Sequence, residues 1–350
     1  MHSKLAVVIL NWNGKEMMRR FLPSVVRYSR LEGVEVIVAD NHSTDGSVEM
    51  LREEFPSVGL VLLDRNYGFA DGYNRALREL DAEYYLLLNS DVEVTPRWLD
   101  PLLAYMDTHL EMAACQPKLL SYHAKEQGRE MFEYAGACGG FLDRYGYPFC
   151  RGRVMSVVEE DRGQYDTVGS LFWATGAALM VRAADYWKVG GLDGRFFAHM
   201  EEIDFCWRLR SRGRGIACVP ESRVYHVGGA TLNKENPRKT YLNFRNNLLM
   251  LYKNLSEEEL GPVMRVRRWL DYLAAFTFLL KGERGSAQAV FRARRDFKQM
   301  LPDFEASRKE NRQAALLATV PERISGSLLW AFYVRRKNTF TKVMRQTKRK

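Results

Sequence analysis

Residues Leu86 to Val94 read LLLNSDVEV and join a short apolar run to an abrupt polar end at Asn89, Ser90 and Asp91. Such a run, bounded by polar residues, is typical of a strand buried on both faces of a parallel sheet. Ligands of open α/β sheets bind outside the carboxyl ends of the strands. We therefore expect Asp91 to project into a cleft, where a carboxylate suits a hard divalent cation completed by substrate phosphates and water. The same residues also fit a plain turn, and this stretch alone does not separate the two interpretations.

The chain before this stretch repeats the same pattern of apolar runs and polar ends. Three earlier runs predict strands, at residues 5–10, 34–39 and 60–63. The segments between them predict helices, one ending near Tyr28, one beginning near Thr44 or Asp45, and one ending near Leu80. Strands that alternate with helices at this spacing indicate an α/β fold with a mostly parallel central sheet and flanking helices.

Two common nucleotide-binding motifs are absent from the sequence. Asn11-Trp12-Asn13-Gly14 follows the first strand in place of a glycine-rich dinucleotide fingerprint, and no phosphate-binding Gly-Lys-Ser/Thr loop occurs. The sequence therefore argues against a dehydrogenase or a P-loop enzyme. A nucleotide can still bind at the strand ends, where Asp40 is able to accept a hydrogen bond from the ring imide of uracil or thymine. A carboxylate that merely precedes a helix is the alternative for Asp40.

The middle of the chain has weaker periodicity. Residues 121–170 are rich in Gly and Tyr and predict a long loop, which is a lid, a binding surface or a disordered segment; the aromatic residues favour binding. Residues 172–181 predict a strand whose small central residues, including Gly176, permit close approach of a ligand. Residues 216–220 predict another strand.

Two adjacent acidic residues and one histidine are further candidates for chemistry. A helix is expected over the residues after Glu201 and Glu202, which puts both carboxylates in its first turn, where the helix dipole favours anions. Acidic residues are common at helix starts, so the two glutamates also fit a purely structural role. That role does not explain the aromatic run directly upstream. His226 is followed by Gly228, and an imidazole there can serve as a metal ligand, although a lone histidine is more often structural.

The order of these motifs resembles the family 2 glycosyltransferases, and most closely the rhamnosyltransferase-like branch of surface-polysaccharide assembly. The similarity covers roughly residues 4–255 and rests on the ordered set rather than on any one motif. The set comprises Val7–Asn13, Asp40–Ser47, Asn66–Ala70, Leu88–Asp91, Thr175–Ala177, Glu201–Asp204 and His226, followed by Tyr241–Asn247.

The resemblance implies a nucleotide-diphospho-sugar transferase fold of the A type and transfer with inversion at the anomeric carbon. The metal motif Asp-x-Asp of the family falls on Asn89-Ser90-Asp91, with Asn in place of the first Asp. Asp91 and the late His226 are then the implied ligands of Mg²⁺ or Mn²⁺. The acidic motif that supplies the base reads Glu201-Glu202 in this chain, where the family usually has Glu-Asp.

Roles for individual residues follow from this resemblance. Glu202, with Glu201 as the second choice, is expected to be the catalytic base. The donor, a UDP- or dTDP-sugar, is expected to contact a set of polar and small residues: Asn11, Asp40, Asn66, Gly68, Asn89, Ser90 and Gly176. The acceptor is expected to be a lipid-linked sugar or an oligosaccharide.

Composition bounds the class and the compartment. The 350 residues are 46% hydrophobic and 27% charged, which is ordinary for a globular protein. No apolar run reaches the roughly 20 residues that span a bilayer, and the start at Met1 leads directly into a strand pattern rather than a signal peptide. Five cysteines without a Cys-x-x-Cys pair argue against a disulfide framework and favour a reducing cytoplasm.

The charge is concentrated at the C-terminal end. Residues 261–350 contain 21 Lys and Arg but 7 Asp and Glu, a net charge of +14 against −5 for residues 1–260. We expect a catalytic domain over residues 1–255 and a basic helical region over residues 256–350, with a capping box at Ser256–Glu259. Apolar helices over 263–281 and 328–334, flanked by arginines, suit a peripheral contact with an anionic membrane on its cytoplasmic face. Helices that pack on the catalytic domain are the alternative, and nucleic-acid binding by this region is a weaker one.

Two rival functions remain open at this stage. A nucleotidyltransferase also uses an α/β sheet and Mg²⁺, but it calls for a basic, glycine-rich loop after the first strand, which Asn11–Gly14 does not provide. A catalytically impaired sugar-nucleotide-binding protein is supported by Asn89 and Glu202, which both depart from the family pattern.

Overall fold

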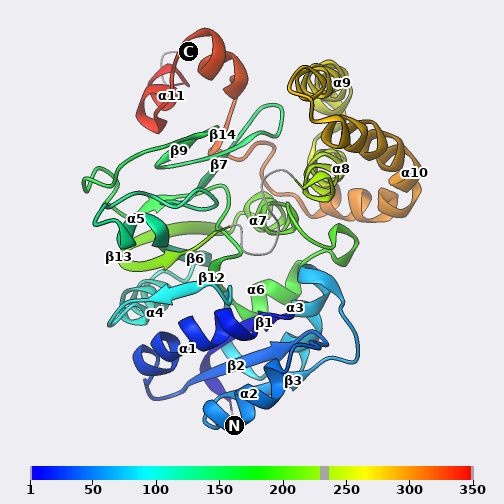
Figure 1. Cartoon of the computed structure of the whole chain (residues 1–350). Helices are drawn as coiled ribbons and strands as arrows, with labels where there is room; N and C mark the ends of the chain where they lie inside the picture. Colours follow the sequence, from blue (N-terminus) through cyan, green and yellow to red (C-terminus); the bar gives the residue numbers. More distant parts are fainter. Residues whose placement is uncertain (1, 229–235, 348–350) are drawn as a thin grey trace.

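The computed structural model describes residues 2–228 and 236–347, and a large central sheet organises them (Figure 1). Its strands are β1 Ser3–Asn11, β2 Val34–Asp40, β3 Gly59–Leu62, β4 Ala82–Leu88, β5 Val92–Val94, β6 Met112–Ser121, β11 Gly169–Ser170, β12 Ala178–Arg182 and β13 Gly215–His226. They lie in the order β11-β13-β6-β12-β4-β1-β2-β3, with β5 paired to β13. β1 to β4 pair in parallel, whereas β12 runs antiparallel to β4 and β6. The predicted α/β class is confirmed.

Helices cover both faces of this sheet because the strands are apolar on both sides. Alternate residues of β1 point to opposite faces, so Leu5, Val7 and Ile9 enter one core while Ala6 and Val8 enter the other. The first core is closed by α1 Lys15–Tyr28, α2 Ser47–Glu54 and α4 Leu99–Thr108. The second is closed by α3 Gly68–Arg78, α6 Ala183–Lys188 and α7 Glu201–Ser211.

The prediction of a long loop over residues 121–170 is wrong. This region forms the short helix α5 Tyr122–Glu126 and most of a second sheet, with strands β7 Gly140–Asp143, β8 Pro148–Cys150, β9 Arg153–Val154 and β10 Val157–Val158. The sheet order is β10-β9-β8-β7-β14, where β14 Arg323–Ile324 comes from far along the chain. Strands of two to four residues are too short to show a period in the sequence.

Two other predicted boundaries differ from the structure. The strand predicted over residues 172–181 begins only at Ala178, because Thr175 to Ala177 form a turn in which Ala178 N donates to Thr175 O at 3.2 Å. The predicted strand at 216–220 is part of the longer β13, which passes a register shift between Val219 and Arg223 and ends at His226.

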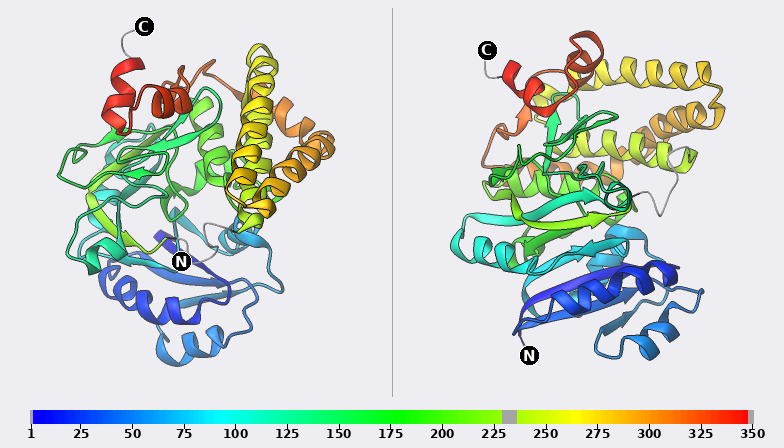
Figure 2. Two further views of the ribbon diagram at one scale, coloured as in Figure 1. Left: turned by 45° about the horizontal axis from the view of Figure 1, so that its top comes forward. Right: turned by 60° about the vertical axis from the view of Figure 1, so that its left-hand side comes forward.

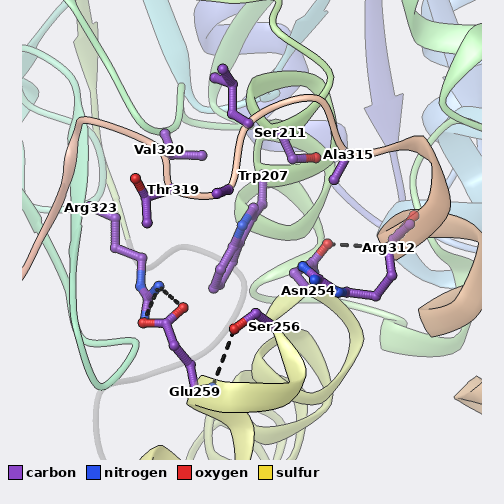
Figure 3. A pocket seen from close by; sticks show the side chains of 13 residues that line it. Trp207, Ser211, Asn254, Ser256, Glu259, Arg312, Ala315, Thr319, Val320 and Arg323 are labelled. Carbon is purple, nitrogen blue, oxygen red and sulfur yellow. Dashed lines mark hydrogen bonds and ion pairs between the residues drawn. The ribbon is translucent and has the colours of Figure 1, made fainter.

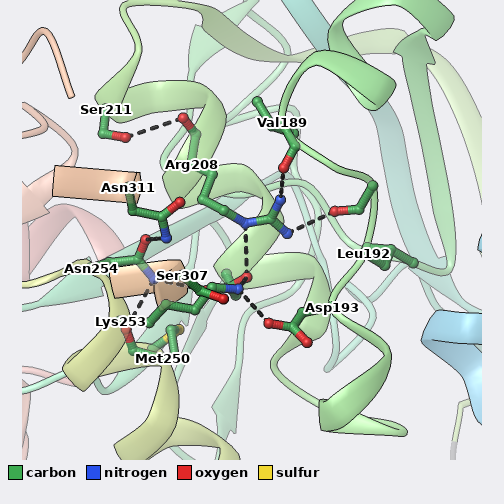
Figure 4. A network of polar contacts seen from close by, with 12 residues as sticks. Val189, Leu192, Asp193, Arg208, Ser211, Met250, Lys253, Asn254, Ser307 and Asn311 are labelled. Carbon is green, nitrogen blue, oxygen red and sulfur yellow. Dashed lines mark hydrogen bonds and ion pairs between the residues drawn. The ribbon is translucent and has the colours of Figure 1, made fainter. Parts of the chain in front are cut away.

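A buried ionic network fixes α7 to its neighbours (Figure 4). Asp204 is fully buried and accepts from Arg208 Nε at 2.9 Å and from Lys253 Nζ at 2.8 Å. Lys253 lies in α8 Pro237–Asn254 and also reaches Asp193 Oδ2 at 2.6 Å. Buried ions that are paired in this way hold a defined geometry, because removing one partner leaves the other uncompensated. The first turn of α7 is therefore held rigidly.

The C-terminal region is helical, as predicted. Its elements are α9 Glu257–Leu280, α10 Arg284–Ala314, a π-helical turn η2 Trp330–Val334 and α11 Phe340–Thr347. Ser256 caps α9 by accepting from Glu259 N at 3.3 Å. The helix begins before Gly261 and Pro262 and continues through them, whereas the sequence predicted a start at Val263. α10 packs against α8 and α9, so the predicted domain boundary at residue 255 falls within a group of packed helices.

Two features of this region bear on function. A pocket between α7, the start of α9 and the segment around Val320 has a cavity volume of about 20 Å³, roughly one water molecule (Figure 3). It is too small for a sugar nucleotide. In residues 2–228 and 236–347, no helix has the length and apolar character needed to cross a bilayer.

Candidate active site

The carboxyl ends of β1 and β2 carry two polar side chains in register. Asn11 pairs with Asp40 across the two strands, and both are buried. Asn11 Nδ2 donates to Asp40 Oδ1 at 2.9 Å, and the backbone N–H of Ser43 donates to Asp40 Oδ2 at 2.8 Å. Asn11 Oδ1 is buried without a hydrogen-bond partner among the described residues. An unsatisfied buried acceptor is costly unless a ligand supplies the donor.

Asn66 and Gly68 are held at the same sheet edge by Asn41, to which the sequence assigned no role. Asn41 Nδ2 donates to Asn66 Oδ1 at 3.1 Å and to the Gly68 carbonyl at 3.0 Å. Gly68 has a φ of +75°, and a Cβ there would lie 2.5 Å from the ring of Phe197. Phe197 O in turn accepts from Phe69 N at 2.8 Å. Glycine is thus required where the start of α3 meets the loop before α7.

The Asn89-Ser90-Asp91 segment follows β4 directly, as predicted. A Cβ on Gly14 would lie 2.5 Å from Asn11 Oδ1 and 3.7 Å from Ser90 Oγ, so this segment adjoins the end of β1. Asn89 N donates to Ala177 O at 3.0 Å. The ends of β1, β2 and β4 therefore meet at one edge of the sheet.

Asp91 and His226 are brought together from positions 135 residues apart. Asp91 Oδ1 lies 3.1 Å from His226 Nε2, and Asn89 Nδ2 lies 3.4 Å from the same nitrogen. On the other side of the ring, Glu133 Oε1 lies 3.5 Å from His226 Nδ1. All three charged groups are buried. Glu133 comes from the region predicted to be a loop, and nothing in the sequence pattern identified it.

The electrostatics of this group are those of an anionic pocket. Burial lowers the pKa of the His226 imidazole, but Glu133 and Asp91 outweigh it and raise the pKa to about 10. Burial raises the pKa of Asp91, but His226 outweighs it, so the pKa is lowered from its usual value. Asp91 and Glu133 thus stabilise a positive charge between them, which in this structure is the protonated His226 imidazole.

The donor set fits a divalent cation that shares its shell with a substrate. No cluster of three or more His, Cys, Asp or Glu side chains with the arrangement of a metal site occurs in the part of the chain that the structure describes. Mg²⁺ characteristically uses one or two protein carboxylates and takes its remaining ligands from phosphates and water. Asp91 and His226 supply such an incomplete set, with Asn89 beside them. Glu133 would orient the imidazole from behind, as outer carboxylates do in metal sites.

Glu201 and Glu202 begin α7 after an unusual backbone. Phe197, His199 and Met200 all have a positive φ, of 66°, 70° and 72°. Each such non-glycine residue costs about 1–3 kcal/mol, and such strain clusters at functional sites. Glu201 and Glu202 each leave one buried carboxylate oxygen without a partner among the described residues. The strained turn thus aims two acidic side chains into a place where the protein does not satisfy them.

Burial shifts both carboxyl groups toward the neutral form. Burial, together with the neighbouring Glu202, raises the pKa of Glu201 well above its ordinary value. Burial raises the pKa of Glu202 to about 7. A carboxylate whose pKa lies near the working pH is suited to general-base catalysis. His199 was not among the residues predicted from the sequence. Its imidazole is neutral near pH 7 because burial lowers its pKa to about 4.

Gly176 lies between Glu202 and the segment that carries Asp91. A Cβ on Gly176 would lie 3.1 Å from the ring of Phe69 and 3.9 Å from Glu202 Cβ. The next residue, Ala177, accepts the hydrogen bond from Asn89 N. Asp91 and Glu202 are therefore linked through the Gly176-Ala177 backbone at the same sheet edge.

Asn246 of α8 holds the strained turn. Its amide Nδ2 lies 2.9, 2.8 and 2.7 Å from the carbonyl oxygens of Phe196, Ala198 and His199. Asn246 is completely buried, and Arg245 Nε donates to its Oδ1 at 2.9 Å. Asn246 lies within the motif at 241–247, but no role was predicted for it. Its contact with the Phe196 carbonyl joins residues 50 positions apart, which a local pattern does not reveal.

Comparisons with known proteins agree with this geometry. Residues 6–153 match the family described as Glycosyl transferase family 2. The chain is 26% identical over 242 residues to the N-acetylglucosaminyl-diphospho-decaprenol L-rhamnosyltransferase of Mycobacterium tuberculosis, which covers 65% of this chain and 76% of that protein. It is 26% identical over 167 residues to the rhamnosyltransferase WbbL of Escherichia coli, covering 46% of this chain and 61% of that protein.

A solved structure supports the fold. The crystal structure of GalNAc-T7 with UDP, GalNAc and Mn²⁺ superposes with a TM-score of 0.59 at 14% identity, covering 95% of this chain and 56% of that one. The chain thus spans little more than half of that protein and shares its A-type glycosyltransferase fold. Residues 6–153 therefore match the family 2 glycosyltransferases, and the chain has the A-type fold and resembles rhamnosyltransferases of that family.

Proposed function

We propose that the protein is an inverting glycosyltransferase that moves a sugar from a nucleoside diphosphate to a hydroxyl of a lipid-linked or polysaccharide acceptor. One observation carries the proposal. The Asp91–His226 pair and Glu202, which has one buried and unsatisfied carboxylate oxygen, adjoin the same sheet edge and are linked through Gly176 and Ala177. A site that has two proposed cation ligands, Asp91 and His226, beside an unsatisfied carboxylate suits group transfer from a diphosphate to an alcohol.

The donor nucleotide would bind across the ends of β1 and β2. Asp40 retains lone pairs on both oxygens and is available to the imide N–H of uracil or thymine, which is why UDP- and dTDP-sugars are the proposed donors. The free Oδ1 of Asn11 adds an acceptor beside it. Asn66, Gly68 and Ser90 would contact the ribose and the phosphates, and Gly176 leaves room for the sugar.

Asp91 and His226, with Asn89 beside them, would hold the Mg²⁺ or Mn²⁺. When bound, this ion supplies Lewis-acid stabilisation of the leaving diphosphate. The rest of the chemistry belongs to the protein. Glu202 accepts the proton of the acceptor hydroxyl as the new bond to the anomeric carbon forms and the bond to the diphosphate oxygen breaks on the opposite face. Burial, which raises the pKa of Glu202 to about 7, makes it a stronger base than a solvated carboxylate.

Glu202 is chosen over Glu201 because of exposure. Glu201 is buried, while Glu202 is half-buried and can reach an incoming acceptor. The name of the mycobacterial relative specifies an acceptor with one N-acetylglucosamine on a diphospho-decaprenol lipid, and rhamnose as the transferred sugar. We propose the same classes for this chain, and accordingly a place at the cytoplasmic face of a membrane in cell-envelope assembly.

A donor panel tests the proposal. We expect UDP- or dTDP-sugars to raise the melting temperature of the protein in the presence of Mn²⁺, and one of them to be hydrolysed slowly or transferred to an acceptor. A stable complex without any turnover would instead support a sugar-nucleotide-binding protein. Release of inorganic pyrophosphate from a nucleoside triphosphate and a sugar phosphate would support a nucleotidyltransferase.

A further inference from the structure

Helix α9 is apolar on its exposed side. Trp269, Leu273, Phe276 and Leu280 are 69%, 61%, 55% and 72% exposed. Their spacing of four, three and four residues places them on one face of the helix. Leu279 and Tyr272 extend the same surface and are also exposed. A contiguous apolar surface of this kind is unusual on a protein that meets only water.

The buried side of α9 carries a charged pair at its centre, while the larger apolar side chains of the helix face solvent. Its buried residues are Val263, Arg267, Asp271 and Ala275. Arg267 and Asp271 are buried, and Arg267 Nη2 lies 3.0 Å from Asp271 Oδ1. Arg294 of α10 lies 2.5 Å from Asp271 Oδ2, and Arg267 Nη1 donates to the Tyr145 carbonyl at 2.8 Å. Turning the apolar side inward would break this buried network, which is strongly destabilising. The outward position of the apolar side is therefore a fixed property of the fold.

A second apolar group lies at the same end of the molecule. Trp330, Tyr333 and Val334 of η2 are all exposed. In Figure 1 and in the right view of Figure 2, α9 and the C-terminal segment lie at the end opposite β1 to β3. Trp and Tyr are the side chains that favour a boundary between water and an apolar phase. We call the exposed side chains of α9 and η2 together the apical face.

Cations flank the apical face. Arg265 and Arg268 are exposed near the start of the α9 stripe, and Lys281 and Arg284 are exposed at its end. Arg335 and Arg336 follow η2 and are also exposed. Apolar and aromatic side chains flanked by Lys and Arg match the headgroup boundary of an anionic membrane. A second copy of the chain fits less well, because an isologous contact would set the same cations against each other.

We propose that the apical face docks the protein on an anionic phospholipid membrane by partial insertion of α9 and η2. This inference rests on the proposed function in one respect: a lipid-linked acceptor would explain why the protein docks on a membrane. Docking itself can be measured without any sugar transfer, so the two proposals can fail separately.

The test is cosedimentation of the full chain with vesicles of phosphatidylcholine containing about 30% phosphatidylglycerol. The variant Leu273→Gln/Phe276→Gln removes apolar area without changing charge. The control Leu62→Gln/Leu110→Gln makes the same kind of change at side chains that are 52% and 70% exposed, in the N-terminal half. All four side chains are solvent-exposed, so both variants are expected to fold, which the melting temperature checks.

We expect the α9 variant to lose at least about tenfold in vesicle partition, since each side chain contributes apolar area. The control variant should partition like the unmodified chain, and binding should fall on pure phosphatidylcholine and at high salt. Equal partition of the α9 variant and the unmodified chain would overturn the proposal. So would a dimer in the absence of lipid that the α9 variant converts to a monomer, because the face would then bind a second copy.

Discussion

Replacing Asn246 by leucine tests whether the strained turn before α7 aims the base. The turn holds Phe197, His199 and Met200 at positive φ, a strain of about 1–3 kcal/mol each. The Asn246 amide has two hydrogens to share among three carbonyl oxygens. Each net hydrogen bond is worth about 0.5–1.5 kcal/mol, and each carbonyl left buried without a partner costs about 1–3 kcal/mol. The Phe196 carbonyl keeps its donors Ala198 N and Arg245 Nη2, so the loss is that of the hydrogen bonds to the Ala198 and His199 carbonyls. Together these contribute about 1–3 kcal/mol that stabilises the strained turn.

We expect Asn246→Leu to let the turn relax and to displace Glu202. A displacement of about 1 Å at a reacting group costs about 10²-fold in rate. The expected result is a fall of that order in kcat for transfer, with the Kd for the nucleoside diphosphate nearly unchanged, because Asn11 and Asp40 lie on other elements. Steady-state kinetics and calorimetric titration measure the two quantities.

Asn243→Leu is the matched control, one turn earlier on α8. Asn243 Nδ2 donates to the Lys239 carbonyl within its own helix at 3.0 Å, so its loss should cost about 1 kcal/mol or less and leave kcat unchanged. The reasoning is refuted if both variants lower kcat equally, or if Asn246→Leu keeps full activity while its melting temperature falls.

The remaining predictions concern Glu202 and Glu133. Glu202→Gln should lower transfer by about 10²–10⁴-fold with nucleotide binding retained; near-normal turnover would remove Glu202 as the base. Because burial raises the pKa of Glu202 to about 7, transfer should increase with pH through that value. The free energy of unfolding should correspondingly fall as pH rises from about 4.5 to about 7, since the folded state disfavours the charged form, and chemical denaturation of Glu202→Gln over this range should show the dependence reduced. Glu133→Leu should raise the Mn²⁺ concentration for half-maximal activity by about 10–100-fold by releasing the His226 ring, and an unchanged Mn²⁺ titration would show that Glu133 does not orient it.

The alternation of apolar runs and polar ends in the sequence predicted the buried strands of the central sheet. The apolar runs of β1, β2 and β4 are buried on both faces, so their lengths and polar ends are visible in the sequence. The position of Asp91 at the end of β4 followed from that alone. The assignment of His226 and Glu202 to the same site came from a family resemblance, since their contacts join distant segments.

The parts that escaped prediction depend on tertiary contacts. Glu133 acts through His226, 93 positions away along the chain, from a region whose strands are too short to show a period. α10 buries alanines such as Ala289 and Ala293, which give a weak apolar signal. For α9 the apolar period was visible in the sequence, but a period does not tell which side is buried. Here the buried side contains the Arg267–Asp271 pair, and the larger apolar side chains are exposed.

The central claim is that Asp91 and His226 hold a cation that faces the diphosphate across from Glu202. The most direct test is anomalous diffraction from a crystal grown with Mn²⁺ and UDP or dTDP. We predict an anomalous peak within about 2.5 Å of both Asp91 Oδ1 and His226 Nε2, with a diphosphate oxygen as a further ligand and the Glu202 carboxyl lining the same cavity. A peak elsewhere, or a Glu202 carboxyl that faces a separate cavity, would contradict the account.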